Sequence, residues 1–278
     1  HYFPDDPPAS IACKALGVNL SDIAAKGAEP LGFLLTLALA DDWDEAWLAD
    51  FCTGLSEAAA LASSPLLGGD TVRAGGPTLI GITALGEVPA GTMVRRDAAR
   101  AGDRLLVSGS IGDAALGLKL RSRPAAPWGG ALSFPARASL VDRYLHPRPR
   151  LALAPALRAH ARAAMDVSDG LVGDLAKMMR AADLSAEVEI AAIPLSDPAR
   201  AALAAEPGLL DAALTGGDDY EILCAADPAA VPALQAAADR AGVPLAVIGT
   251  VTEGSAPPVF RTPGGDARPF RSGSFSHF

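Results

Sequence analysis

Apolar residues recur every three or four positions near the start of the chain and predict a helix over residues 10–26. Ser10 can cap the beginning of this helix, and Gly27 can end it. An apolar run at 31–39 then predicts a buried strand, and a second helical period follows at 44–62. Helix and strand therefore alternate from the first residues onward.

The same alternation continues along the rest of the chain. Helices are predicted over 113–120, 151–163, 171–182 and 228–241, and strands over 65–67, 78–88, 105–108, 186–190, 220–225 and 245–251. Prolines and glycines within residues 121–137 predict a loop. Strands that alternate with helices favour an α/β or α+β fold over a helical bundle or a β-sandwich.

Residues 89–102 predict a boundary between two domains. Pro89, Gly91 and Gly102 punctuate this stretch, and three arginines make it polar. A length of 278 residues suits one large or two medium domains, at about 150 residues per domain. We therefore expect a first domain over 1–92 and a second over 93–278.

Composition and charge exclude several classes of protein. Half of the residues are hydrophobic and 20% are charged, which is typical of a globular chain. The 23 basic and 32 acidic side chains give a net charge of −9, which argues against a nucleic-acid binder with its basic surface. No apolar run reaches the roughly 18 residues of a membrane span. We expect no nucleic-acid partner and no membrane partner.

The cysteines and the first residue bear on the cellular setting. The chain has three cysteines, far apart and odd in number, so neither a disulfide framework nor a CxxC metal pair is expected. This favours a reducing, cytoplasmic environment. No signal peptide is visible. The sequence begins at His1 without a methionine, so we expect that a preceding N-terminal piece is missing.

Aspartates beside glycines or at the ends of apolar runs carry the most information about chemistry. They are Asp22, Asp70, Asp113, Asp166, Asp169, Asp218 and Asp219. Glycine lets the backbone approach a ligand closely, and Mg²⁺ prefers carboxylate and phosphate oxygens. A single Gly-Asp pair is more often a turn or a helix cap. The number of such pairs keeps a metal site open as the alternative.

Other mechanisms have less support in the sequence. The chain has no G-x-x-x-x-G-K-[ST] loop and no G-x-S-x-G elbow, and its four histidines lack metal-ligand spacing. The glycines of residues 109–112 follow a predicted strand and can cradle a phosphate at a helix N-terminus. That signal is weak by itself because the third glycine of a dinucleotide fingerprint is absent.

Five segments resemble the thiamine-monophosphate kinase family in order and spacing over essentially the whole chain. They are KALGVNLSDIAA at 14–25, LGGDT at 67–71, DVSDGL at 166–171, GGDDYE at 216–221 and HF at 277–278. The resemblance implies the two-domain fold of the aminoimidazole-ribonucleotide synthetase superfamily. In that fold an N-terminal mixed sheet with helices pairs into a homodimer, and an α/β domain follows. It also implies ATP-dependent, Mg²⁺-assisted phosphorylation of thiamine monophosphate to thiamine diphosphate.

The resemblance also implies roles for particular residues. Mg²⁺ ligands are Asp22, Asp70, Asp166 and Asp169. ATP contacts are Gly69, Asp70, Arg96 and Ser168. Substrate contacts are His1, Asp218 and Phe275. No catalytic side chain is assigned, because the acceptor phosphate, with a second pKa near 6, is already mostly dianionic at neutral pH.

The chain departs from the family at several places. Asp218 stands where the family usually has Glu, and Ala62 stands where an aromatic residue meets the adenine. The residues before the final His-Phe lack the usual Tyr-Asp pair, and the Asp-rich segment of the family precedes His1. Two alternatives stay open: another ATP-using synthetase of the same superfamily, and a non-catalytic nucleotide or metal sensor. A selenophosphate synthetase would carry a reactive Cys or selenocysteine in an N-terminal loop, and none is visible.

Overall fold

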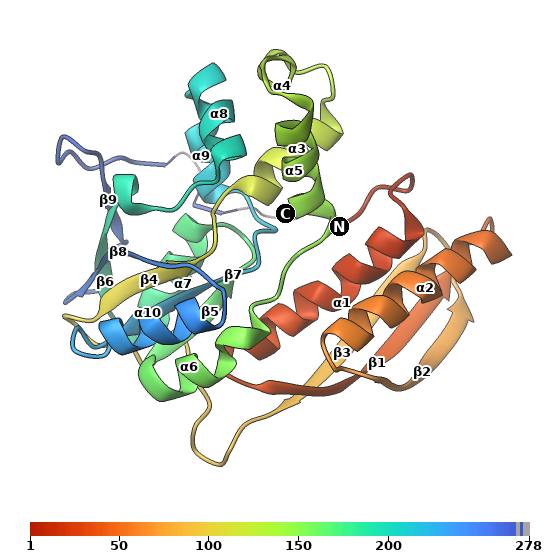
Figure 1. Cartoon of the computed structure of the whole chain (residues 1–278), viewed down its shortest axis with the longest axis horizontal. Coiled ribbons are helices and arrows are strands. Elements are labelled where there is room, and N and C mark those ends of the chain that lie inside the picture. The colour runs from red at the N-terminus through yellow and green to blue at the C-terminus, as the bar shows by residue number, and fades with distance from the viewer. Residues whose placement is uncertain (271–272, 275–278) are drawn as a thin grey trace.

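A computed structural model describes residues 1–270 and 273–274 (Figure 1). The predicted substrate contact Phe275 lies outside these residues. The fold is a mixed α/β arrangement with two separate sheets, as the alternation of helix and strand predicts. Within the described part of the chain, no helix is both long and apolar enough to cross a membrane.

The first sheet has three strands in the order β2-β1-β3. Strand β1 (Glu29–Leu39) pairs in parallel with β2 (Leu66–Arg73) and antiparallel with β3 (Leu79–Glu87). Helices α1 (Pro8–Ala25) and α2 (Glu45–Leu61) lie side by side on one face of this sheet (Figure 1). The core between helices and sheet includes Leu16, Phe33, Leu37 and Phe51.

In the described part of the chain, no helix covers the other face of the first sheet, which exposes several large apolar side chains (Figure 1). Because side chains alternate along a strand, burial of Phe33, Leu37 and Leu39 turns Leu34 and Thr36 to the opposite face. Large apolar residues in and around the sheet remain exposed. They are Leu31, Leu34, Leu66, Leu67, Val72, Leu79 and Leu85.

The second sheet has six strands in the order β5-β7-β4-β8-β6-β9, antiparallel except for the parallel pair β6 and β9. Adjacent residues of β4 point to opposite faces: Leu105 and Val107 enter one core, and Leu106 enters the other. Both faces are therefore covered, unlike those of the first sheet. The strands are β4 (Arg104–Ser108), β5 (Ala163–Val167), β6 (Ser185–Glu189), β7 (Glu221–Ala226), β8 (Leu245–Thr252) and β9 (Val259–Arg261).

Helix α7 covers one face of the second sheet, and α6 and α10 cover the other. Helices α3, α4, α5, α8 and α9 form a separate cluster around Trp128 and Leu140. The helices are α3 (Asp113–Ser122), α4 (Pro127–Ala131), α5 (Phe134–Leu145), α6 (Ala154–His160), α7 (Leu171–Ala182), α8 (Asp197–Ala205), α9 (Leu209–Thr215) and α10 (Val231–Arg240), with 3₁₀ turns η1 (Leu151–Leu153) and η2 (Ile190–Ala192).

The loop predicted over 121–137 is wrong. Helix α3 continues to Ser122, and two further helices, α4 and α5, begin within this stretch. Their prolines lie in the first helical turn, where no backbone donor is needed, so proline starts these helices instead of breaking them. Ser133 caps α5, because its side chain accepts a hydrogen bond from the backbone N–H of Ala136.

The helix predicted over 151–163 is wrong only at its end. A 3₁₀ turn and the short helix α6 occupy residues 151–160, and strand β5 starts at Ala163. Alanine-rich residues fit both helix and buried strand, so the local pattern does not separate them. The predicted strand at 65–67 extends through Arg73, so Gly69 and Asp70 lie inside β2 and not in a turn.

Candidate functional site

Two of the predicted metal ligands lie together where α1 meets β5. Asp22 belongs to the last turn of α1, and Asp166 lies in β5, where it is buried. Burial, and to a smaller extent the nearby carboxylate of Asp22, raises the pKa of the Asp166 carboxyl to about 6. A buried carboxylate that is repelled by a second, exposed carboxylate suits a hard cation, which would relieve the repulsion.

Lys26 and Arg96 lie beside this carboxylate pair. The backbone N–H of Val94 donates to the carbonyl of Lys26 at 3.1 Å, which holds the segment before Arg96 against the end of α1. Burial lowers the pKa of the Lys26 ammonium, and the charge of Arg96 lowers it further, whereas Asp22 and Asp166 oppose the shift. The predicted ATP contact Arg96 is therefore within electrostatic range of the same ammonium as both carboxylates.

The turn after β5 carries Ser168 and Asp169. The backbone N–H groups of both residues donate to one carboxylate oxygen of Asp174, each at 2.9 Å. Gly170 has φ +111°, and a Cβ there would lie 2.6 Å from the backbone of Thr215, so only glycine fits. This turn is fixed by its own hydrogen bonds, and the side chains of Ser168 and Asp169 remain partly exposed.

Lys177 of α7 neutralises the carboxylates of this turn. Its ammonium lies 2.5 Å from a carboxylate oxygen of Asp169 and 2.9 Å from one of Asp174. An ammonium at this place shows that the turn accepts positive charge beside Asp169.

The loop before β7 lies directly on the turn after β5. The backbone N–H of Asp218 donates to the carbonyl of Ser168 at 2.9 Å, and that of Tyr220 donates to the carbonyl of Val167 at 2.8 Å. Asp218 and Tyr220 both have positive φ, at +73° and +50°, which is uncommon for residues other than glycine. This backbone turns both side chains toward a cavity.

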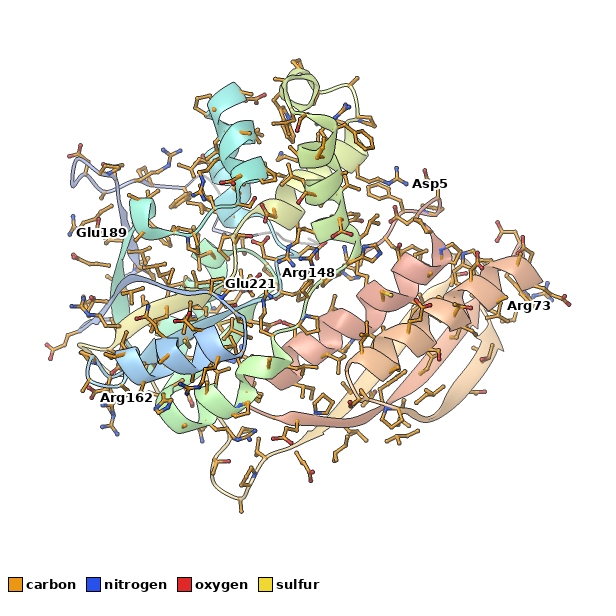
Figure 2. All side chains as sticks on the ribbon, in the orientation of Figure 1. Asp5, Arg73, Arg148, Arg162, Glu189 and Glu221 are labelled. Carbon is orange, nitrogen blue, oxygen red and sulfur yellow. The ribbon has the colours of Figure 1, made fainter. Side chains whose placement is uncertain are left out.

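Two buried carboxylates, those of Asp219 and Glu221, fix the loop before β7. Glu221 is fully buried, and Figure 2 shows it in the interior of the molecule. It accepts hydrogen bonds from Ser108 at 2.6 Å and from Arg143 at 2.9 Å, and pairs with Arg150 as well. Asp219 is also buried and accepts hydrogen bonds from the backbone N–H groups at the start of α3.

The position of Asp219 argues against a phosphate cradle over 109–112, for which the sequence gives only a weak signal. Its carboxylate accepts from Gly112 at 2.7 Å and from Ala114 at 3.3 Å, the donors that a phosphate would need. Burial raises the pKa of Asp219 well above its ordinary value, and these hydrogen bonds oppose the shift. The hydrogen-bond acceptor at this helix N-terminus is therefore supplied by the chain itself.

A cavity of about 440 Å³ joins the turn, the loop and the N-terminal segment. Its lining residues are His1, Tyr2, Phe3, Leu118, Tyr144, Ser168, Asp169, Gly217, Asp218 and Tyr220. A second cavity, of about 820 Å³, shares His1, Tyr2 and Tyr220 with it and extends between α1 and β3. Four of the residues predicted as site residues, His1, Ser168, Asp169 and Asp218, thus come from three distant segments and face one space.

Gly69 and Asp70 lie apart from this space, on β2 of the first sheet. A Cβ at Gly69 would lie 1.9 Å from the carbonyl oxygen of Leu35, so the close approach of β1 requires glycine. Asp70 is exposed and pairs with Thr36, which places it on the face without helices. Among the described residues, no group of three or more Asp, Glu, His or Cys side chains is arranged to hold a metal ion.

Sequence reasoning missed several residues that face the site. Lys14 pairs with Asp218, Tyr144 lines the smaller cavity, and Lys177 pairs with Asp169. Lys14 is buried among the apolar residues of α1, and a charged residue at such a position is a signal that the sequence does contain. Tyr144 and Lys177 lie in helices whose pattern carries no comparable signal.

Both halves of the chain match families of known proteins. Residues 1–88 match the AIR synthase related protein, N-terminal domain, and residues 100–260 match the AIR synthase related protein, C-terminal domain. The thiamine-monophosphate kinase of Caulobacter vibrioides is 40% identical over 276 residues, which are 98% of this chain and 76% of that protein.

Solved structures with the same architecture include thiamine-monophosphate kinases. The crystal structure of this kinase from Stenotrophomonas maltophilia superposes with a TM-score of 0.86 at 37% identity, covering 96% of this chain and 82% of that one. The structure of AaThiL complexed with AMPPCP and TMP superposes with a TM-score of 0.84 at 27% identity, covering 100% of this chain and 83% of that one.

Proposed function

The chain belongs to the thiamine-monophosphate kinase family of AIR synthase related proteins, and from this premise we propose that it phosphorylates thiamine monophosphate with ATP. The products are thiamine diphosphate and ADP. The observation that carries the proposal is the cavity in which Ser168, Asp169 and Asp218 meet, beside the Asp22–Asp166 carboxylate pair. A related structure binds AMPPCP, an ATP analogue, together with TMP.

The carboxylates suit Mg²⁺ as the metal of this reaction. Asp22 and Asp166 are close enough to raise the pKa of Asp166, and Asp169 follows in the next turn, already paired with a cation. We assign Asp22, Asp166, Asp169 and, from the first sheet, Asp70 as ligands. Bound Mg²⁺ would neutralise the phosphates of ATP and of the acceptor, which is the main task in phosphoryl transfer between anions.

The nucleotide and the acceptor meet different parts of the chain. We assign Gly69, Asp70, Arg96 and Ser168 to ATP, and His1, Asp218 and Phe275 to thiamine monophosphate. The wall of the smaller cavity is aromatic, with Phe3, Tyr144 and Tyr220 beside the carboxylate of Asp218. Aromatic faces and a carboxylate attract an organic cation, so this wall suits the positively charged thiazolium ring.

No general base is needed for the transfer. The acceptor phosphate is mostly dianionic at neutral pH and can attack the γ-phosphorus directly. The side chains act by binding both substrates, holding them in line and excluding water. This fits a site that is rich in aspartate and in which, among the residues that the structure describes, His1 is the one histidine that lines either cavity.

We propose that the chain acts as a homodimer that pairs through the bare face of the first sheet. That face exposes several leucines, and contiguous apolar surface of this kind is typical of protein interfaces. Asp70 lies on the same face, so a second copy would cover it and complete its surroundings. This arrangement would account for the separation of Asp70 from the other aspartates.

The domain division and the cellular setting follow from the same proposal. The two family matches end at residue 88 and begin at residue 100, which supports a boundary after residue 92. We place the reaction in the cytoplasm, where ATP is available. The three cysteines are free thiols, which is consistent with a reducing compartment.

Product formation tests the proposal directly. The protein is incubated with ATP, thiamine monophosphate and Mg²⁺, with and without EDTA, and ADP and thiamine diphosphate are quantified. We expect equal amounts of both products, and none with EDTA. ADP without thiamine diphosphate would favour another ATP-using synthetase, and nucleotide binding without turnover would favour a non-catalytic relative.

A further inference from the structure

Lys14 is a buried cation that lines the larger cavity and contacts Asp218, which lines the smaller one. It lies in α1, its side chain is 7% exposed, and its ammonium is 2.8 Å from a carboxylate oxygen of Asp218. The same ammonium lies 3.6 Å from the centre of the Tyr144 ring, on its face. Burial lowers the pKa of Lys14, and the charge of Asp218 opposes that shift. A buried ammonium is costly, so its partners must compensate.

The carboxylate of Asp218 is held from two sides. One oxygen accepts the hydrogen bond of Lys14, and the other lies 3.4 Å from the hydroxyl of Tyr220. The backbone of Asp218, at φ +73°, points the side chain into the cavity but leaves its terminal rotation open. Lys14 therefore supplies the strongest contact that sets the direction of this carboxylate.

The pair also connects the two halves of the molecule. Lys14 comes from the helix that covers the first sheet, and Asp218 comes from the loop before β7 of the second sheet, 204 residues later. Tyr144, from α5, lines the smaller cavity, and the Lys14 ammonium lies over its ring. A ligand that contacts Asp218 thus meets a carboxylate whose position depends on both halves.

Resting on the proposed function, we propose that Lys14 is a positioning residue that holds Asp218 in the orientation in which it binds thiamine monophosphate. Lys14 then acts on the binding of the acceptor and not on that of ATP. It acts through Asp218, so its effect disappears when Asp218 loses its charge.

The first test compares K14M with the control K119M. Methionine keeps the length of the buried stem and removes the charge, and Lys119 is an exposed lysine of α3 outside the site. We expect K14M to raise the KM for thiamine monophosphate roughly tenfold, because the loss of the Lys14 ammonium leaves the Asp218 carboxylate without its charged partner. The KM for ATP and kcat should stay within about twofold of wild type, and K119M should leave all three unchanged.

The second test is a double-mutant cycle of K14M and D218N, read as kcat/KM at limiting thiamine monophosphate. If Lys14 acts through Asp218, adding K14M to D218N lowers kcat/KM by less than about twofold. An equal loss in both backgrounds would overturn the proposal, and so would a K14M enzyme that behaves like K119M. The variant K14R keeps the charge and should recover most of the lost affinity.

Folding and function are separated by two further measurements. If K14M does not fold, as judged by its melting curve, K14Q takes its place in the same comparison, since it also removes the charge that pairs with Asp218. Absence of turnover in the wild-type protein would reject the proposed function. Normal wild-type turnover with an unchanged K14M would reject only the role of Lys14.

Discussion

The two sheets of this protein differ in how many of their faces they bury. The six-stranded sheet buries both faces, with α7 on one side and α6 and α10 on the other. The three-stranded sheet buries one face under α1 and α2 and leaves leucines exposed on the other. Helices of the same chain cover both faces of the second sheet. The first sheet instead exposes an apolar surface that a further protein surface would cover.

The predicted site residues divide along the same line. Asp166, Ser168, Asp169 and Asp218 come from the ends of strands in the covered sheet, and their loops are fixed by hydrogen bonds. Asp70 comes from the open sheet and is exposed. If the proposed function is right, one reaction needs both environments, and each can be tested separately.

The largest effect is expected from removing one carboxylate charge in each sheet. D166N and D70N should each lower kcat by a factor on the order of 10³, because a lost metal ligand removes charge stabilisation from the transition state. Steady-state assays of product formation at saturating ATP and Mg²⁺ measure this. Near-normal turnover in D70N would remove the open sheet from the chemistry.

The same two variants should differ in stability. The pKa of Asp166 is raised to about 6 in the fold, so its ionisation destabilises the protein as pH rises from the ordinary carboxyl pKa toward that value. Near neutral pH, D166N should therefore melt at or above the wild-type temperature without metal. D70N should melt like wild type, since Asp70 is exposed. A D166N protein that melts well below wild type would contradict the repulsion between Asp22 and Asp166.

The next effect concerns the bare face of the first sheet. L34D places a charge at the middle of that face, and we expect the proposed dimer to weaken by roughly a hundredfold, because a buried charge there lacks a partner. Light scattering over a concentration series measures the change. F134D is the matched control, because Phe134 is 76% exposed on α5, away from the sheet. A wild-type protein that is monomeric at micromolar concentration would refute the dimer.

Features that follow from a local pattern could be predicted from the sequence, and features that depend on distant residues could not. Helix α1 follows from a regular apolar period, and the Gly-Asp segments follow from local composition. Strand β5 does not, because its alanines suit a helix and its partner β7 lies about sixty residues away. The face on which Asp70 lies depends on the register between β1 and β2. The contact between Lys14 and Asp218 joins residues 204 positions apart, which no local pattern encodes.

A smaller effect is expected at the acceptor site. D218A should raise the KM for thiamine monophosphate by about tenfold and leave the KM for ATP within about twofold, because it removes a carboxylate from the wall of the smaller cavity only. Steady-state kinetics with each substrate varied in turn give both constants. Equal changes in both KM values would contradict the assignment of Asp218 to the acceptor.

The smallest effect tests whether the two halves unfold together. Asp44 caps α2 through the N–H of Trp47 at 2.7 Å, and Ser133 caps α5 through the N–H of Ala136 at 3.3 Å. D44A and S133A should each cost about 1 kcal/mol of unfolding free energy. Because α1 contacts β5 and β7 and pairs with Asp218, we expect one calorimetric transition that both variants shift. Two transitions, each shifted by only one variant, would mean that the sheets unfold independently. The ion pair of Lys14 and Asp218 would then join two separately stable units, and its loss would affect acceptor binding without lowering the stability of either.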